Sequence, residues 1–315
     1  MEILTQKDII KRFNKPWVSS YKKILTLTDK QEETVELIEY HPCPTGSQWM
    51  INQYQKTSPL VIKAKKEANK HIYTLKKGKS NIELKPSLQA AGIENVEITD
   101  DEIKITHAGL AGAGVGAARC RGKAEGVNRV ELYEKGGGSK IGKATIITPK
   151  LLKLIIGVDD TDTKEEGATW TLANNIAQEI SNKKIAHYLD HITCQLYPKN
   201  PNKTQNCVSI ATVFAVKPEN KEKLIQTFKE ILKQTTLSDK TTIAIQEGFT
   251  TPSNLRQFGI ESKKSMKTVE EAQKIAKENN IRIEYITGKD GIIGAVAALG
   301  LYEDITEAAK IYTED

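Results

Sequence analysis

The apolar and polar positions of the first half of the chain are spaced for one helix and several short strands. We expect an amphipathic helix over residues 7–25, since apolar side chains recur there at helical intervals. Short alternating segments predict strands over 35–40, 96–99, 103–106, 130–133 and 145–148. This pattern predicts an α+β N-terminal domain over residues 1–148.

The second half alternates predicted strands with predicted helices. A buried strand over 154–158 leads through an acidic turn to a helix over 169–181. Further strands are expected over 192–197, 208–215, 241–246 and 281–287, and further helices over 220–234, 269–279 and 292–301. Such strand–loop–helix units predict an α/β domain over 149–315, with room for a ferredoxin-like insertion around 208–285. The domain boundary is expected near Thr148-Pro149-Lys150, where a long apolar run begins.

Composition and cysteine usage indicate a soluble cytoplasmic protein. Of the 315 residues, 38% are hydrophobic and 27% charged, and no apolar run reaches the roughly 18 residues of a membrane span. The N-terminus lacks the apolar block of a secretion signal, so we expect a cytoplasmic location and no membrane partner. The cysteines are widely spaced and form no Cys-x-x-Cys pair: Cys43, Cys120, Cys194 and Cys207. This spacing argues against a zinc ribbon, and we expect four reduced thiols.

Positive charge is concentrated in the first half of the chain. Residues 1–150 contain 25 Lys and Arg against 17 Asp and Glu, whereas residues 151–315 contain 21 against 23. This asymmetry is typical either of a lysine-rich solvated surface or of a patch that binds RNA, nucleotide or an acidic protein. Aromatic residues are sparse among the basic ones, so the pattern does not decide between these alternatives.

An acidic turn follows the predicted strand 154–158. The run is Gly157-Val158-Asp159-Asp160-Thr161-Asp162-Thr163. Asp159, Asp160 and Asp162 would repel one another unless a cation lies among them, and Mg²⁺ prefers carboxylate oxygens. The alternative is a helix N-cap, which needs only one such residue. We therefore predict a metal–phosphate site at this turn.

Two further loops carry groups that suit a phosphate. In the segment 198–206, Lys203 and Thr204 offer an ammonium and a hydroxyl side by side, although an exposed polar loop would look the same. Gly288 and Gly291 lie at a strand-to-helix turn, where backbone N–H groups can approach an anion. Together the loops predict a site for ATP and Mg²⁺.

The order of these motifs resembles that of archaeal agmatidine synthetase, which modifies an isoleucine tRNA. The matching segments are 156–163 with 167–171, 196–204 and 291–300. The resemblance implies a kinase-like ATP-binding domain in which Asp159, Asp160 and Lys203 are catalytic. It also implies that Asp159, Asp160 and Asp162 bind the metal, and that the nucleotide contacts are Gly157, Thr161, Thr163, Thr169, Thr171, Thr204, Gly288 and Gly291.

Two positions depart from the synthetase pattern. Trp170 stands where that family has a threonine that takes part in phosphotransfer, and Gln205 replaces an arginine. The resemblance therefore implies nucleotide binding but not agmatine transfer. The whole chain, through the segments 41–47 and 107–123, also resembles the archaeal methanogenesis marker protein 11 family, which implies a methanogenic setting.

A glycine-rich stretch over 108–123 has three interpretations. Gly112, Gly114 and Ala117 have the spacing of a dinucleotide fold, with Glu131 placed to meet a ribose. The second interpretation is a clamp for phosphates or RNA made by Arg119, Arg121 and Lys123, and the third is a tight structural turn.

Three functions remain open from the sequence. The leading one is an ATP-dependent, kinase-like transferase or ligase whose acceptor the sequence does not name. The second is a non-catalytic, nucleotide-responsive assembly factor. The third is a protein that modifies or binds RNA.

Overall fold

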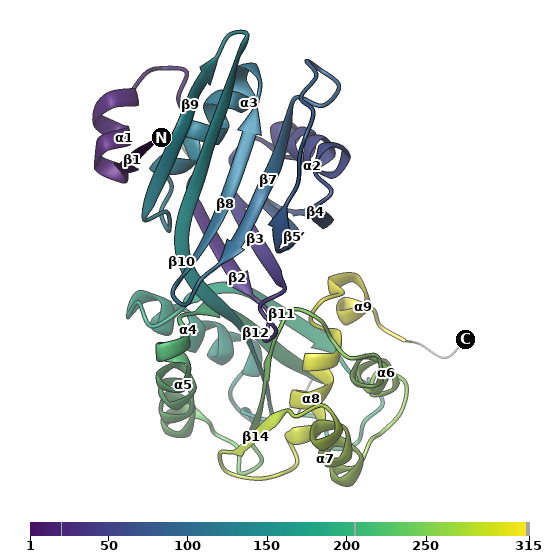
Figure 1. Ribbon diagram of the computed structural model, residues 1–315. Helices are drawn as coiled ribbons and strands as arrows, with labels where there is room; N and C mark the ends of the chain where they lie inside the picture. The colour runs from purple at the N-terminus through teal and green to yellow at the C-terminus, as the bar shows by residue number, and fades with distance from the viewer. Residues whose placement is uncertain (20, 205, 313–315) are drawn as a thin grey trace. The chain divides into compact units, whose positions relative to one another are not determined.

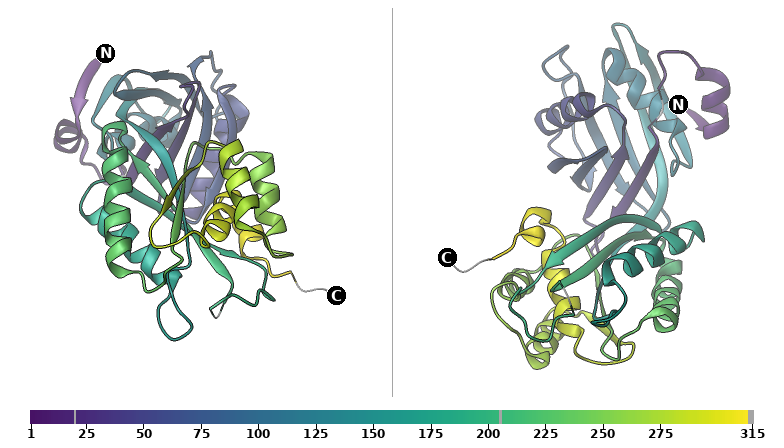
Figure 2. Two further views of the ribbon diagram at one scale, coloured as in Figure 1. Left: turned by 90° about the horizontal axis from the view of Figure 1, so that it is seen from below. Right: turned by 180° about the vertical axis from the view of Figure 1, so that it is seen from behind.

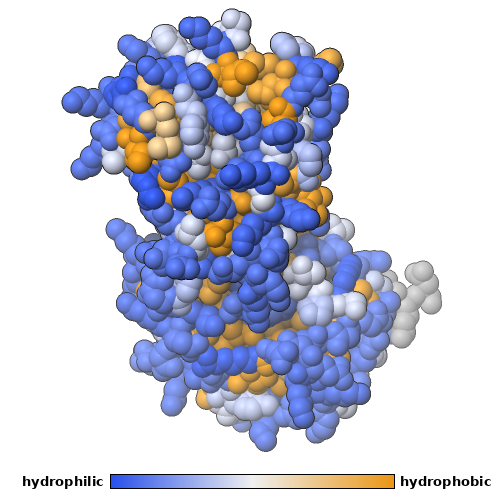
Figure 3. Space-filling model, viewed as in Figure 1, coloured by the Kyte–Doolittle hydropathy of each residue, from blue (hydrophilic) through white to orange (hydrophobic). Residues whose placement is uncertain are grey.

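The protein divides into two compact units, Met1–Leu151 and Leu152–Asp315. A computed structural model describes residues 1–19, 21–204 and 206–312. No helix in these ranges is long and apolar enough to cross a bilayer. Hydrophilic residues dominate the face shown in Figure 3, with apolar residues scattered among them.

The first unit is a strongly twisted, mostly antiparallel sheet with helices beside it (Figure 1). Its elements are β1 (Glu2–Thr5), α1 (Gln6–Phe13), β2 (Lys23–Thr28), β3 (Thr34–Tyr40), α2 (Pro44–Thr57), β4 (Val61–Glu67), β5 (Lys70–Lys76), β6 (Gly78–Lys79), β7 (Ala91–Ile98), β8 (Glu102–Gly109), α3 (Ala111–Val115), η1 (Gly116–Cys120), η2 (Arg121–Lys123), β9 (Arg129–Gly137) and the first part of β10 (Lys140–Asp159).

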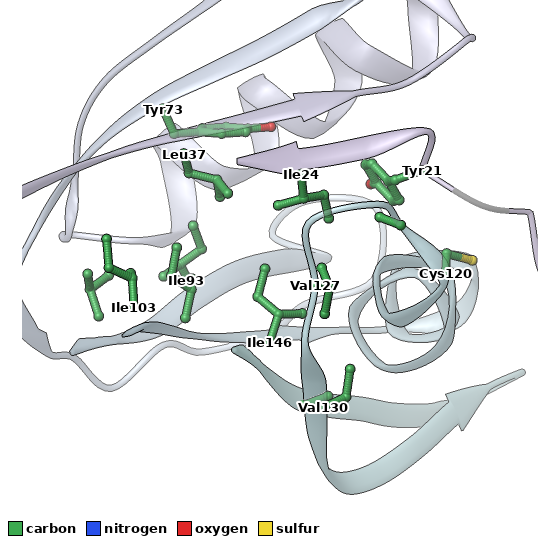
Figure 4. Close-up of a cluster of buried hydrophobic side chains, with 14 of the residues drawn as sticks. Tyr21, Ile24, Leu37, Tyr73, Ile93, Ile103, Cys120, Val127, Val130 and Ile146 are labelled. Carbon is green, nitrogen blue, oxygen red and sulfur yellow. The ribbon is translucent and has the colours of Figure 1, made fainter. Parts of the chain in front are cut away.

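The strands of the first unit follow the order β4-β5-β3-β2-β10-β8-β7-β6, and β9 pairs with β10 and β1. Alternate apolar side chains of these strands meet in one core (Figure 4). Ile24, Leu37 and Tyr73 are fully buried in it, together with Ile93 and Ile146. The α+β class expected for this part of the chain agrees with these elements.

The predicted helix over 7–25 is wrong beyond residue 13. Thr5 and Asp8 form a capping box that begins α1, and the helix ends at Phe13, just before Lys15 and Pro16. Proline disfavours helical geometry in the residue before it, so the helix does not continue. Lys23–Thr28, expected at the end of this helix, is strand β2. Helix α2 was not predicted, because its first turn carries proline and glycine.

The glycine-rich stretch forms α3, the π-helical turn η1 and the 3₁₀ turn η2. The preceding strand β8 is antiparallel to both β7 and β10. A dinucleotide fold requires parallel strands around its glycine turn, so that interpretation is wrong. Glycines are needed here for close backbone approach: a Cβ on Gly142 would lie 2.0 Å from the carbonyl oxygen of Gly114.

The second unit contains five strands and six α-helices in its described part (Figures 1 and 2). Its elements are the end of β10, α4 (Thr169–Asn182), β11 (His187–Gln195), β12 (Val208–Val216), η3 (Pro218–Asn220), α5 (Lys221–Thr235), β13 (Thr242–Glu247), α6 (Ser253–Glu261), α7 (Val269–Glu278), β14 (Arg282–Tyr285), α8 (Ile292–Leu301) and α9 (Ile305–Ala309).

These strands form an antiparallel sheet in the order β11-β12-β10-β13-β14. Side chains of β10 alternate between its faces: Leu154, Ile156 and Val158 pack with α4 and α5, whereas Ile155 packs with α6, α7 and α8. The unit is therefore mixed α/β with helices on both faces. Thr148-Pro149-Lys150, expected as a boundary, lies inside the continuous strand β10.

Candidate functional site

The predicted loops converge at one edge of the second sheet. Strand β10 ends there beside the start of β13, since Asp159 pairs with Thr242. Strands β11 and β14 end at the same edge, because Gln195 pairs with Val208 and Tyr285 with Thr242. The sheet is antiparallel, so this edge also receives the segments that enter β12 and β13.

A cavity of about 180 Å³ opens at this edge. The polar and charged side chains that line it are Asp159, Asp160, Asp162, Tyr197, Asn200, Asn202, Lys203, Thr204, Asn206, Lys240, Ser262, Ser265, Lys267 and Asp290. All three carboxylates of the acidic turn thus meet Lys203 and Thr204 around one space, which we call the acidic cavity.

Asp159 lies directly beneath helix α8. A Cβ on Gly294 would come within 1.7 Å of Asp159 Oδ2, so only a glycine leaves room for this carboxylate. Burial, and then the charges of Asp160 and Asp162, raise the pKa of Asp159 well above its ordinary value. The carboxylate is therefore poorly solvated and close to other negative charges.

Asp160 adopts a left-handed backbone conformation, with φ of 55°. Its carbonyl oxygen accepts a hydrogen bond from Thr241 Oγ1 at 2.6 Å, which holds the turn against the start of β13. Burial raises the pKa of Asp160 to about 6, with Asp290 and Asp162 adding to the shift and Lys240 opposing it. Within the described residues, neither Asp159 nor Asp160 forms an ion pair.

The threonines of the acidic turn mainly hold its shape. Thr161 Oγ1 donates to Thr169 Oγ1 at 2.9 Å, and the Thr161 backbone N–H donates to the same oxygen. Both residues are buried, and Thr163 Oγ1 accepts the backbone N–H groups of Glu165 and Glu166. Thr171 is exposed on α4, away from the lining of the acidic cavity.

The second loop reaches the acidic turn through Thr204. Its hydroxyl donates to Asp162 Oδ1 at 3.2 Å. Lys203 lines the cavity, and its ammonium donates to the carbonyl oxygen of Pro198 in the same loop. Gln205 lies outside the described residues.

The three glycines predicted to contact the nucleotide allow close packing beside the cavity. A Cβ on Gly157 would lie 2.1 Å from the Ala295 carbonyl oxygen, and a Cβ on Gly288 would lie 2.1 Å from the Asp239 carbonyl oxygen. At Gly291 it would lie 2.9 Å from the Asp159 carbonyl oxygen. These glycines bring α8 and the start of β13 against the acidic turn.

Lys240 and Asp290 are site residues that the motifs did not identify. Lys240 Nζ lies 3.5 Å from Asp290 Oδ2, and both side chains line the acidic cavity. Lys240 comes from the segment before β13, which carries no recognisable motif. Asp290 could have been predicted, because it lies in the turn 288–291, which the sequence already assigned to the site.

The acidic cavity fits a divalent cation held partly by a phosphate. Asp159 and Asp160 are neighbouring, half-buried carboxylates that form no ion pair with another described residue. No group of three or more His, Cys, Asp or Glu side chains in the described chain is arranged to hold a metal alone. Mg²⁺ usually takes one or two carboxylates and completes its shell with water and phosphate, so this donor set suits it.

The basic clamp predicted in the first unit is not formed by three free cations. Arg121 is fully buried and makes a bidentate ion pair with Glu39. Arg119 Nη2 donates to the carbonyl oxygen of Gly136, and Lys123 Nζ to that of Val18. Arg121 therefore cannot contact RNA, whereas Arg119 and Lys123 are half-buried, and a phosphate contact by these two residues stays a prediction.

Comparison with known proteins relates the second unit to tRNA-modifying enzymes. The TiaS TCKD domain family matches residues 155–221. The 2-agmatinylcytidine synthetases TiaS of Pyrococcus horikoshii and Thermococcus sibiricus, named for an isoleucine tRNA, are 31% and 32% identical over 151 and 155 residues. Those alignments cover 47% and 48% of this chain but 35% of each synthetase, so the chain spans about a third of the length of these relatives.

A solved structure and a second archaeal protein are also similar to this chain. The solved complex of TiaS with its isoleucine tRNA and ATP aligns with 47% of this chain and 36% of its own, with a TM-score of 0.41 and 20% identity. The uncharacterized protein MJ0921 of Methanocaldococcus jannaschii is 52% identical over 292 residues, which cover 93% of this chain and 97% of that protein.

Proposed function

Because the chain belongs to the family of the uncharacterized protein MJ0921, and residues 155–221 of its second unit match the TiaS TCKD domain family, we propose that it is an ATP-using enzyme acting on RNA. The observation that carries the proposal is the meeting of Asp159, Asp160 and Asp162 with three lysines around one cavity. The enzyme class agrees with the transferase or ligase expected from the sequence.

In this proposal the acidic cavity holds the phosphates of ATP with Mg²⁺. Asp159 and Asp160 would hold the metal, and Asp162 would support them through its hydrogen bond to Thr204. When bound, Mg²⁺ would neutralise charge on the phosphates. Lys203 and Lys240 line the same space and supply positive charge to phosphate oxygens. Phosphoryl transfer depends mainly on such positioning and neutralisation.

RNA is the favoured acceptor class for two reasons. The relatives of the second unit are synthetases of a modified tRNA cytidine, and Trp170 presents an exposed indole beside the acidic turn. Trp170 is 51% exposed, and it lines a second hollow with residues 162–169. Its ring packs edge-on against His191, with centroids 5.2 Å apart. A ring fixed in this way offers a face on which a base can stack.

The direct test is calorimetric titration of the protein with ATP and Mg²⁺. Asp160→Asn removes the charge while keeping a residue type that tolerates the left-handed backbone. We expect at least tenfold weaker binding in this variant and unchanged binding in Glu165→Gln, an exposed acid of the same loop. Absence of binding heat in the wild type would overturn the proposal.

Catalysis is tested separately from binding. The protein is incubated with ATP, Mg²⁺ and tRNA from a methanogenic archaeon, and the formation of ADP or AMP is followed. We expect tRNA-dependent turnover that Asp159→Asn abolishes. ATP binding without any turnover would instead favour the nucleotide-responsive assembly factor.

Trp170 is the observation that supports this second candidate, since it stands where the synthetase family has the threonine that takes part in phosphotransfer. A methanogenic setting remains a prediction from the sequence resemblance.

A further inference from the structure

The first unit contains a cavity of about 720 Å³ that the proposed ATP chemistry does not use. It lies among the glycine-rich stretch, the start of α2 and the hairpin between β9 and β10. Its lining is Ser19, Tyr21, His41, Gly46, Trp49, Met50, Pro86, Ser87, Ala90, Leu110, Ala111, Gly112, Ala113, Gly116, Cys120, Gly138 and Ser139. We call it the apolar cavity. Its volume is within the range of small-molecule sites.

The chemistry of this lining selects for an uncharged, largely apolar ligand. Among the described residues, no Asp, Glu, Lys or Arg lines the cavity. Three rings contribute to it, Tyr21, His41 and Trp49, and the Tyr21 and His41 centroids are 5.0 Å apart. From the stretch 111–116, only alanines and glycines line the cavity: Ala111, Gly112, Ala113 and Gly116. Rings and small residues together suit a flat group.

One buried polar group lies behind this lining. Arg121 is fully buried, and its Nε and Nη2 donate to Glu39 at 2.5 and 3.0 Å. Its Nη1 has no hydrogen-bond partner among the described residues. That nitrogen lies 3.8 Å from the position that a Cβ would take on Gly116, which lines the cavity.

An unmade hydrogen bond from a buried guanidinium is costly, so an acceptor at this point would be favoured. Glu39 already balances the charge of Arg121, which removes the need for an anion. A neutral oxygen, such as a carbonyl, is therefore the group that completes the donor set of Arg121.

We propose that the apolar cavity binds a small, uncharged, largely apolar molecule with a flat ring and one oxygen that accepts a hydrogen bond from Arg121. Gly116 is then a glycine because a side chain would stand between Arg121 and the ligand. The site belongs to the first unit alone and stands independently of ATP binding by the second.

The test uses the full chain and the neutral fluorophore N-phenyl-1-naphthylamine. Fluorescence titration should show saturable binding of one molecule per chain. The bound probe is then displaced by 2-acetylnaphthalene or 2-ethylnaphthalene, which have nearly the same shape but differ in the carbonyl oxygen. We expect the ketone to displace the probe at about tenfold lower concentration, as one hydrogen bond to a charged donor implies.

The location is tested with Gly112→Trp, which should weaken probe binding at least tenfold by filling the cavity. A Cβ on Gly112 meets nothing within 4 Å, so the new side chain can begin there without a clash. Ser139→Trp, at an exposed lining position, is a second filling variant that does not depend on α3. Lys274→Trp, on the exposed face of α7 in the other unit, is the matched control and should bind as the wild type does.

Each result decides one part of the proposal. Unchanged probe binding in both filling variants, or no saturable binding in the wild type, would overturn the site. Equal displacement by the two naphthalenes would overturn the role of Arg121 as donor. Weaker binding in both filling variants, with a clear preference for the ketone, would establish the site and its ligand class.

Discussion

At the scale of single residues, the thiol of Cys43 is the group whose reactivity the structure defines most sharply. It is exposed at the N-cap of α2, where Sγ lies 3.6 Å from Thr45 Oγ1 and accepts the Gly46 N–H at 3.3 Å. The bonds from Thr45 and Gly46 lower the pKa of this thiol. Burial instead raises the pKa of Cys207 to about 11 and that of Cys194 to about 12.

We predict that iodoacetamide alkylates Cys43 first at pH 7.5. The thiolate is the nucleophile, and a lowered pKa increases its fraction below the ordinary cysteine pKa. Thr45→Val removes one stabilising hydrogen bond, so alkylation at pH 7.5 should slow and approach the wild-type rate above about pH 10, where free thiols are ionised. Peptide mapping by mass spectrometry measures both rates, with Thr171→Val as the control. Faster alkylation of Cys207 would contradict the prediction.

The role of the acidic turn could be predicted from the sequence, because its crowded carboxylates repel one another unless a cation lies among them. The roles of its threonines were not readable, since Thr161 and Thr169 bond to each other across eight positions of the chain. Lys240 was also missed, because its place at the cavity depends on how β13 pairs with β10. Residue identity predicted the chemistry, whereas only the fold shows which groups meet.

At the scale of elements, helix α8 links the core of the second unit to its site. Its small residues allow tight packing on the sheet, and nine of its ten residues are buried. Two glycines show what this packing requires: Gly157 faces the α8 backbone, and Gly294 faces the Asp159 carboxylate.

Gly157→Ala should destabilise the second unit. The new Cβ would lie 2.1 Å from the backbone oxygen of Ala295, which cannot move without shifting α8. Overpacking of this kind costs about 1–3 kcal/mol, enough to lower the thermal midpoint by several degrees. Thermal unfolding followed by circular dichroism measures the change. Gly112→Ala is the matched control, because its Cβ meets nothing, and an equal effect in both variants would contradict the packing argument.

Gly294→Ala should instead affect the site more than the stability. Its Cβ would meet the end of the Asp159 side chain, which can rotate away. We expect a small change in thermal midpoint and at least tenfold weaker binding of ATP and Mg²⁺, because Asp159 is displaced. Calorimetric titration and thermal unfolding of the same preparation separate the two effects. Wild-type ATP affinity in this variant would argue against Asp159 as a ligand.

The periodic elements were the predictable ones. Helices α4, α5, α7 and α8 and strand β12 lie within two residues of their expected ranges. Local pattern failed where proline or long-range pairing decides the structure, as at α1 and in the pair β4 and β5. The antiparallel order of the second sheet was not readable, since strand–helix alternation does not fix strand direction.

At the scale of the whole molecule, the unequal charge of the two halves indicates that RNA would contact basic residues of the first unit. Arg121 is buried against Glu39, and Arg119 and Lys123 each donate to a backbone carbonyl oxygen, so the exposed positive charge that could contact RNA lies mainly outside this stretch. The segment 61–85 carries eight lysines and only two glutamates. Of these lysines, Lys63, Lys76, Lys77 and Lys79 are exposed and form no ion pair within the described chain.

We predict that these four lysines contribute to tRNA binding through phosphate contacts. Changing all four to glutamine should weaken tRNA binding and reduce the dependence of log K on log salt by up to about 0.9 per lost phosphate contact. Filter binding at several salt concentrations measures both quantities. The matched control changes the exposed lysines Lys223, Lys233, Lys274 and Lys277 of the second unit to glutamine. The total charge change is the same, so an equal loss in both variants would indicate a diffuse electrostatic effect rather than a binding surface on the first unit.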